Sequence, residues 1–224
     1  MAGVKTVITS GGGMASSLSA IDIAASERNV YAVIGVDPSA PEEDAAFVKE
    51  ITERIKSDRK IIGVGEIGLD YKVSKVDKEL QRKLFTQQIK VANDLDVPVV
   101  IHSRGAIEDT IKAVNEARPK KAMFHYYEGD EKQAQHLANL GYMISIPPIE
   151  SSRRKRVINS LQLSNIVVET DSPVVGKTPI DVIKTVGWIA QIKGLTFKDT
   201  AVGITQNVKK LFNSRINTSR IAPS

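Results

Sequence analysis

Residues 61–102 read IIGVGEIGLDYKVSKVDKELQRKLFTQQIKVANDLDVPVVIH, and this stretch decides the fold class. Short Val/Ile-rich runs stand at its two ends, IIGVGEI at 61–67 and VPVVIH at 97–102. Between them, residues from about 77 to 96 place apolar side chains along one stripe of a helix. Apolar runs with little alternation are typical of parallel strands covered on both faces. The stretch therefore predicts a strand, a helix and a second strand parallel to the first.

The same alternation extends along the rest of the chain. Further strands are predicted at 4–8, 30–36, 121–125, 141–146 and 165–170, and further helices at 16–28, 41–56, 105–117, 130–139, 151–160, 178–193 and 197–213. A (β/α) barrel uses roughly 250 residues for eight such units. We therefore predict an α/β fold, a TIM (β/α) barrel in which seven of the eight strands are recognisable. It forms one domain over residues 1–224, and a doubly wound open sheet is the alternative architecture.

Composition excludes several classes of protein. There are no cysteines, which excludes a disulfide scaffold, a Cys-ligated zinc site and a thiol nucleophile. No apolar stretch approaches membrane-spanning length, and the first residues lack the apolar run of a signal peptide. We expect a cytoplasmic protein with no membrane partner. The net charge of +5 mildly favours an anionic partner.

The chemically informative residues stand at predicted strand ends. Glu66 closes IIGVGE, His102 closes VPVVIH, His125 closes KAMFH, and Asp171 follows IVVET. In a parallel barrel these ends converge on the face that carries the active site. Histidines and carboxylates together are a ligand set for a divalent ion such as Zn, Mn or Mg. Two of the three histidines share this position, whereas His136 lies within a predicted helix and is interpreted as a surface residue.

Several ordered motifs resemble those of one known family, the TatD-type deoxyribonucleases. GEIGLDY resembles the family's glutamate signature, and ETDSP is similar to its aspartate signature. The similarity is collinear and also includes QRKLFTQQIKVANDLDVPVVIHSR at 81–104, HYYEG at 125–129, LGYMISIPP at 140–148, and GWIAQIKGL with NVKKLF near the C-terminal end. The resemblance implies a TIM barrel that hydrolyses phosphodiester bonds of DNA with one or two metal ions.

The resemblance also implies a role for each matching residue. Glu66 bridges or ligates metal, and His102 and His125 complete one metal site with it. Asp171 ligates the other metal and acts as general base toward the attacking water. Arg104 follows His102 by two residues and suits a substrate phosphate, because guanidinium binds phosphate through two hydrogen bonds; a salt bridge at the rim is its alternative role.

The sequence departs from the family pattern in two places. The family opens with a strand carrying Asp-x-His-x-His, which this sequence does not contain, and VKTVITSG resembles the family's second strand. In GVDPSAP at 35–41, Asp37 stands where relatives commonly have histidine, and we assign it to substrate binding. We expect one ion held by Glu66, His102 and His125. We also expect an open barrel edge between residues 4–8 and 165–170 that promotes self-association.

Two alternative functions stay open. Besides DNA hydrolysis, the alternatives are a catalytically impaired paralogue that binds nucleic acid or a partner protein, and a metal-dependent hydrolase of another small-molecule bond. The run Arg153-Arg154-Lys155-Arg156 suits a DNA backbone, although such runs are usually solvated faces. Tyr126 and Tyr127 either stack on a base or pack near the site.

Overall fold

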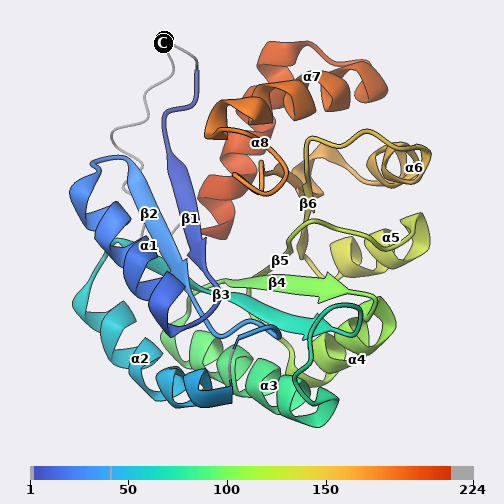
Figure 1. Cartoon of the computed structure of the whole chain (residues 1–224). Coiled ribbons are helices and arrows are strands. Elements are labelled where there is room, and N and C mark those ends of the chain that lie inside the picture. Colours follow the sequence, from blue (N-terminus) through green and yellow to red (C-terminus); the bar gives the residue numbers. More distant parts are fainter. Residues whose placement is uncertain (1–2, 41, 213–224) are drawn as a thin grey trace. The chain divides into compact units, whose positions relative to one another are not determined.

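The computed structural model describes residues 3–40 and 42–212. Seven strands alternate with helices along these residues (Figure 1). The strands are β1 (Val7–Gly11), β2 (Val30–Ile34), β3 (Ile61–Asp70), β4 (Val99–Arg104), β5 (Ala122–Phe124), β6 (Met143–Ile146) and β7 (Ile166–Val168). The α-helices are α1 (Met14–Ser26), α2 (Val48–Ser57), α3 (Lys78–Leu95), α4 (Ile107–Ala117), α5 (Glu131–Asn139), α6 (Ser152–Ser160), α7 (Val182–Lys193) and α8 (Phe197–Leu211). The predicted series of elements is thus confirmed.

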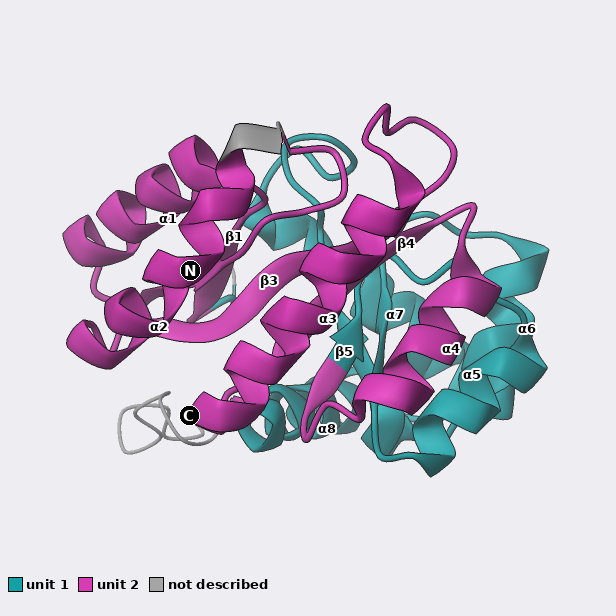
Figure 2. Cartoon of the chain, turned by 90° about the horizontal axis from the view of Figure 1, so that it is seen from below, with its two compact units in different colours: residues 1–4, 123–211 teal, residues 5–122, 212–224 magenta. Residues whose placement is uncertain are grey.

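The chain divides into two compact units (Figure 2). Unit 2 comprises Lys5–Ala122 and Phe212–Ser224. Its strands β1 to β4 are parallel and adjacent in chain order, with Val7 beside Val30 and Val64 beside Val99. Helix α1 packs on β1 and β2, and α3 packs on β3. Consecutive strands that neighbour one another belong to a barrel, because a doubly wound sheet reverses its strand order at a switch point.

Unit 1 comprises Met1–Val4 and Met123–Leu211. Strand β6 pairs in parallel with β5 on one side and β7 on the other. Helices α7 and α8 pack on each other and on β7, and α5 packs on α6. Because the strands are parallel, their carboxyl ends lie on one side of the unit's sheet, followed by His125, Pro147 and Glu169.

Strand boundaries differ from the predicted ones where polar residues take part in pairing. The first strand runs over Val7–Gly11 rather than 4–8, because its residues through Ser10 and Gly11 pair with β2. Strand β3 continues past Glu66 to Asp70, and β4 continues past His102 to Arg104. Neither residue closes its strand as predicted. Pairing between neighbouring strands, which composition does not reveal, sets these ends.

Both faces of the inner strands are buried. In β3 every residue except Glu66 is buried, which explains the unbroken apolar run in the sequence. In β1 only Gly11 is buried, and this strand is the first in the strand order of unit 2. Among the described residues, no helix combines the length and the apolar character needed to cross a membrane.

Candidate metal centre

Glu66 and His102 lie side by side in unit 2. The register between β3 and β4 shifts between Val64 and Ile67, so Glu66 stands at an irregularity of the strand. Its Oε2 lies 3.9 Å from Nδ1 of His102, and about a quarter of each side chain is exposed. The carboxylate and the imidazole therefore face a common space that solvent can reach.

Asp70 supports His102 from the opposite edge of the imidazole. Its Oδ2 lies 3.5 Å from His102 Nε2, and its side chain is 2% exposed. Burial acts to raise the pKa of the Asp70 carboxyl, but hydrogen bonds from the backbone N–H groups of Val73 and Lys72, together with the imidazole, outweigh it and lower the pKa. A charged carboxylate at this position orients His102 so that Nδ1 faces Glu66.

Asp37 and Arg104, the two residues assigned to substrate binding, both belong to unit 2. Desolvation, assisted by the negative charge of Glu66, raises the pKa of Asp37 despite a hydrogen bond from the Ser39 N–H. Asp37 lies near enough to Glu66 and His102 for electrostatic interaction with both. Arg104 is exposed at the end of β4, two residues after His102, and therefore leaves the strand on the same face. Their substrate-binding roles stay predictions.

Two buried glutamines of α3 fix the backbone around this half of the site. Gln88 accepts a hydrogen bond from Val36 N–H and donates one to Val36 O, directly before Asp37. Gln81 does the same for the N–H and carbonyl of Asp70. Each carboxamide thus satisfies both the N–H and the carbonyl of one residue, as a neighbouring strand would. Helix α3 thereby positions the segment before Asp37 and the end of β3 at Asp70.

His125 and Asp171 lie side by side in unit 1. His125 follows β5, and its Nδ1 lies 2.6 Å from Oε2 of Glu169. Its Nε2 lies 4.0 Å from Oδ1 of Asp171. The His125 side chain is 10% exposed. Glu169 thus fixes the orientation of the ring, with Nε2 turned toward Asp171.

The backbone on both sides of this pair is constrained. Tyr126 has φ 44° and Asp171 has φ 50°, values that non-glycine residues adopt uncommonly and that cluster at functional sites. Glu169 Oε1 accepts a hydrogen bond of 2.5 Å from Tyr126 N–H, which holds the first of these conformations. The Arg154 guanidinium stacks over the Tyr126 ring at 5.0 Å. Tyr126 is thus fixed on two sides.

Sequence reasoning missed two residues of this arrangement, Asp70 and Glu169. Both stand within the quoted motifs GEIGLDY and ETDSP. Asp70 is four residues after Glu66 in β3, and Glu169 precedes Asp171 by two. Their presence in the two motifs was the available signal, whereas the histidine contact that each one makes is set by the fold.

The two halves have the same chemical design. Each presents a histidine at the carboxyl end of a parallel strand, a carboxylate on one ring nitrogen, and a further carboxylate near the other. Carboxylate–histidine pairs of this kind fix the ring and raise its basicity toward a metal. The donor set therefore fits a divalent ion. That the four predicted ligands form one site stays a prediction.

Comparison with known proteins agrees with this chemistry. The family described as TatD related DNase matches residues 1–213. The chain is 32% identical to Deoxyribonuclease TATDN3 of Homo sapiens over 199 residues, which is 82% of this chain and 72% of that protein. It is 29% identical to the uncharacterized metal-dependent hydrolase MJ1582 of Methanocaldococcus jannaschii over 220 residues, 94% of this chain and 86% of the relative.

A solved structure gives the same result for the fold. The crystal structure of YjjV, a TatD homologue from Escherichia coli, matches 95% of this chain and 88% of its own with a TM-score of 0.86 at 23% identity. The TIM-barrel fold with seven recognisable strands is thereby confirmed. The chain belongs to the family of TatD-related deoxyribonucleases and is a metal-dependent hydrolase of that family.

Proposed function

We propose that the protein hydrolyses phosphodiester bonds of DNA, using a divalent metal ion held by Glu66, His102 and His125. The observation that carries the proposal is the 2.6 Å pair between His125 and Glu169 beside Asp171. It is the arrangement that a metal-binding histidine needs, with one ring nitrogen occupied and the other facing a carboxylate. The name of the human relative, a deoxyribonuclease, supports DNA as the substrate.

Each residue has a defined task in this proposal. The metal ion supplies a water of lowered pKa and neutralises charge on the phosphoryl oxygens. Glu66, His102 and His125 hold the ion, as three protein ligands do in catalytic zinc sites. Asp171 accepts the proton of the attacking water at its carboxylate. Asp70 and Glu169 hold the two imidazole rings in their orientation, and Arg104 binds a substrate phosphate.

The ligand set also favours particular metals. Two imidazoles suit Zn or Mn, whereas Mg prefers an all-oxygen shell and retains its water. We therefore propose Zn or Mn as the working ion, at about one equivalent per chain for a three-ligand site. Mg is expected to support less hydrolysis than either.

The test is reconstitution of the purified protein. Chelator-stripped protein is reloaded with Zn, Mn or Mg, and cleavage of single-stranded and plasmid DNA is measured with metal content. We expect cleavage with Zn or Mn and a loss of at least about a hundredfold in Glu66→Gln, because a metal ligand is removed. Glu79→Gln, an exposed carboxylate on α3, is the matched control. Equal cleavage by both variants, or cleavage without metal, would contradict the proposal.

A further inference from the structure

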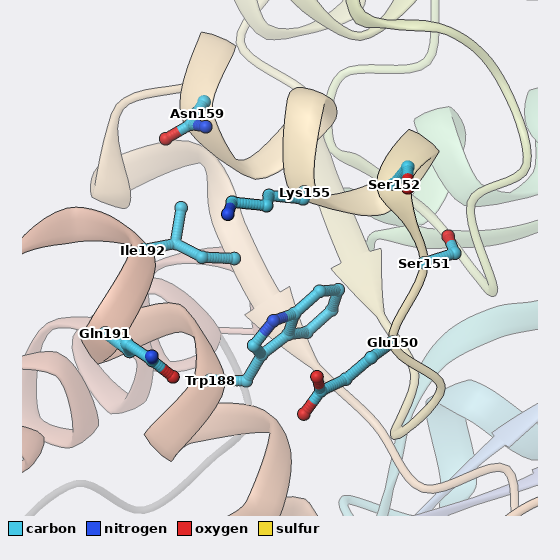
Figure 3. Close-up of a pocket in the computed structure, with 8 residues that line it drawn as sticks. All are labelled: Glu150, Ser151, Ser152, Lys155, Asn159, Trp188, Gln191 and Ile192. Carbon is cyan, nitrogen blue, oxygen red and sulfur yellow. The ribbon is translucent and has the colours of Figure 1, made fainter.

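A cavity lies between α6 and α7 in unit 1, outside the residues assigned to metal. It has a volume of about 560 Å³ and is shown in Figure 3. Volumes of this size are typical of sites that hold a small organic group. Its lining residues are Glu150, Ser151, Ser152, Lys155, Asn159, Trp188, Gln191 and Ile192.

Helical periodicity explains why these side chains meet. On α6, Ser152, Lys155 and Asn159 are separated by three and four residues and share one face. On α7, Trp188 shares a face with Gln191 and Ile192 for the same reason. The two faces line an open space with an indole wall, an ammonium group and two carboxamides. Such a space combines a stacking surface with hydrogen-bonding groups.

The four basic residues at 153–156 make two kinds of contact. Arg153 donates to Glu128 O, Arg154 donates to Ile149 O, and Arg156 pairs with Glu131. Lys155 instead lines the cavity, and Figure 3 shows its side chain extending above the indole of Trp188. The three arginines therefore have structural partners, whereas the lysine presents its charge to the cavity.

The cavity has one positively charged end and one negatively charged end. Figure 3 shows the Glu150 carboxylate on the other side of the indole from Lys155. An anion is attracted to the lysine end and repelled from the glutamate end. A carboxylate accepts hydrogen bonds from ring N–H or exocyclic amino groups. A base carrying such donors, with its phosphate at Lys155, satisfies both ends.

The cavity also lies on the appropriate side of unit 1. Glu150, Ser151 and Ser152 follow the carboxyl end of β6. His125 and Asp171 follow the carboxyl ends of β5 and β7, which are parallel to β6. The Glu150 end of the cavity is therefore on the side of the sheet where the proposed reaction takes place.

We propose that this cavity binds an unpaired base of single-stranded DNA that flanks the bond to be cleaved. The base stacks on Trp188 with its N–H groups toward Glu150, and its phosphate contacts Lys155. Stacking on an indole requires a base that is not paired in a duplex. This inference rests on the proposed DNA substrate, and it adds a second binding site that favours single strands.

Trp188 makes the inference directly measurable. It is the only tryptophan in the sequence, so the tryptophan emission of the protein reports this cavity alone. Zn-loaded protein is titrated with a single-stranded phosphorothioate oligodeoxynucleotide that resists hydrolysis. Binding is followed in parallel by the anisotropy of a label on the oligonucleotide. We expect tryptophan emission to fall in step with the anisotropy change.

Variants test each contact separately. Lys155→Ala is expected to weaken oligonucleotide binding about threefold to tenfold and to reduce its salt dependence, because one phosphate contact is lost. Lys198→Ala removes an exposed charge from α8 and is the matched control. Trp188→Phe keeps an aromatic ring and is expected to bind better than Trp188→Ala, which loses about tenfold. Unchanged emission at saturation, no oligonucleotide binding, or equal affinity of both lysine variants would overturn the inference.

A small chromogenic phosphodiester separates this inference from the proposed function. Its hydrolysis depends on the metal site and does not need the cavity. Hydrolysis of this ester and of DNA without any change in tryptophan emission would refute the cavity's role alone. A fall in emission without any metal-dependent cleavage would support the binding site and refute the proposed function.

Discussion

The two histidines differ in their distance from the carboxylate that contacts each ring. In unit 1, His125 Nδ1 and Glu169 lie 2.6 Å apart, and the same glutamate accepts the Tyr126 N–H. In unit 2, His102 Nε2 lies 3.5 Å from Asp70. The His125 side chain is 10% exposed, against 24% for His102. Glu169 therefore holds His125 more closely than Asp70 holds His102.

The two carboxylates orient their imidazole rings in different ways. Glu169 acts on its histidine by a short, charge-assisted hydrogen bond. Asp70 accepts hydrogen bonds from the Lys72 and Val73 N–H groups at Oδ1 and contacts its histidine more distantly through Oδ2. Its main effect is on the loop after β3. We therefore expect substitutions in unit 1 to act on metal affinity, and those in unit 2 to act partly through backbone position.

The largest effect is expected from removing the firmly held ligand. His125→Ala should lower metal content from about one equivalent to near zero under dilute metal, because a three-ligand site loses a ligand. The loss of affinity should exceed the roughly 10–100-fold typical of residues behind the ligands. His136→Ala, on α5, is the control. Metal analysis after gel filtration measures both; equal metal content would exclude His125 as a ligand.

Strand packing beside His102 predicts the next largest effect. A Cβ at Gly68 would lie 1.9 Å from the carbonyl oxygen of His102, and φ at Gly68 is +153°. Gly68→Ala must push β4 away, at a cost of about 3 kcal/mol in the free energy of unfolding. Gly187→Ala, inside α7 with only Phe197 at 4.0 Å, should stabilise by up to about 1 kcal/mol. Denaturant unfolding measures the two variants, and equal midpoints would contradict the packing argument.

Glu169→Gln tests the close pair directly. The amide keeps the shape but loses the charge and one of the two acceptor oxygens, so the imidazole is less basic and less well oriented. We expect metal affinity to fall about 10–100-fold with the fold unchanged. Competition with a chromogenic chelator measures the affinity, and circular dichroism checks the fold. An affinity equal to that of the unaltered protein would show that the 2.6 Å contact does not tune His125.

Asp70→Asn should give the smallest effect. The asparagine oxygen can still accept from Lys72 and Val73 N–H, so the loop keeps its caps. In the distant contact to His102, an amide NH2 replaces the charged oxygen Oδ2. We expect a loss in metal affinity of about tenfold or less, at the low end for residues of this kind. A loss larger than that of Glu169→Gln would reverse the comparison between the two halves.

The sequence predicted the elements well because their apolar periods are strong. The continuous burial of β3 and the apolar stripe of α3 are local consequences of composition. Strand ends were predicted less well. Ser10 and Gly11 look like loop residues but pair with Val33 and Ile34, and only the partner strand reveals that.

The candidate ligands were also predictable, whereas the carboxylates that contact the two histidines from behind were not. Glu66, His102, His125 and Asp171 stand out because their residue types recur at strand ends. Asp70 and Glu169 are equally polar and equally close to strand ends, but their roles depend on which ring nitrogen each one contacts. That geometry arises from folding and has no signature in spacing alone. Self-association through the edge of β1 stays a prediction.

Helix α3 has a consequence for how this half of the molecule can change. Gln81 and Gln88 are seven residues apart, about two helical turns, and each holds a different loop of unit 2. One inserted residue between them would rotate one glutamine by about 100° relative to the other, so only one loop could keep its clamp. The number of residues between the two glutamines is therefore fixed. Its side chains tolerate replacement singly on the exposed face, but insertions and deletions within this interval are forbidden as long as both loops must stay in register.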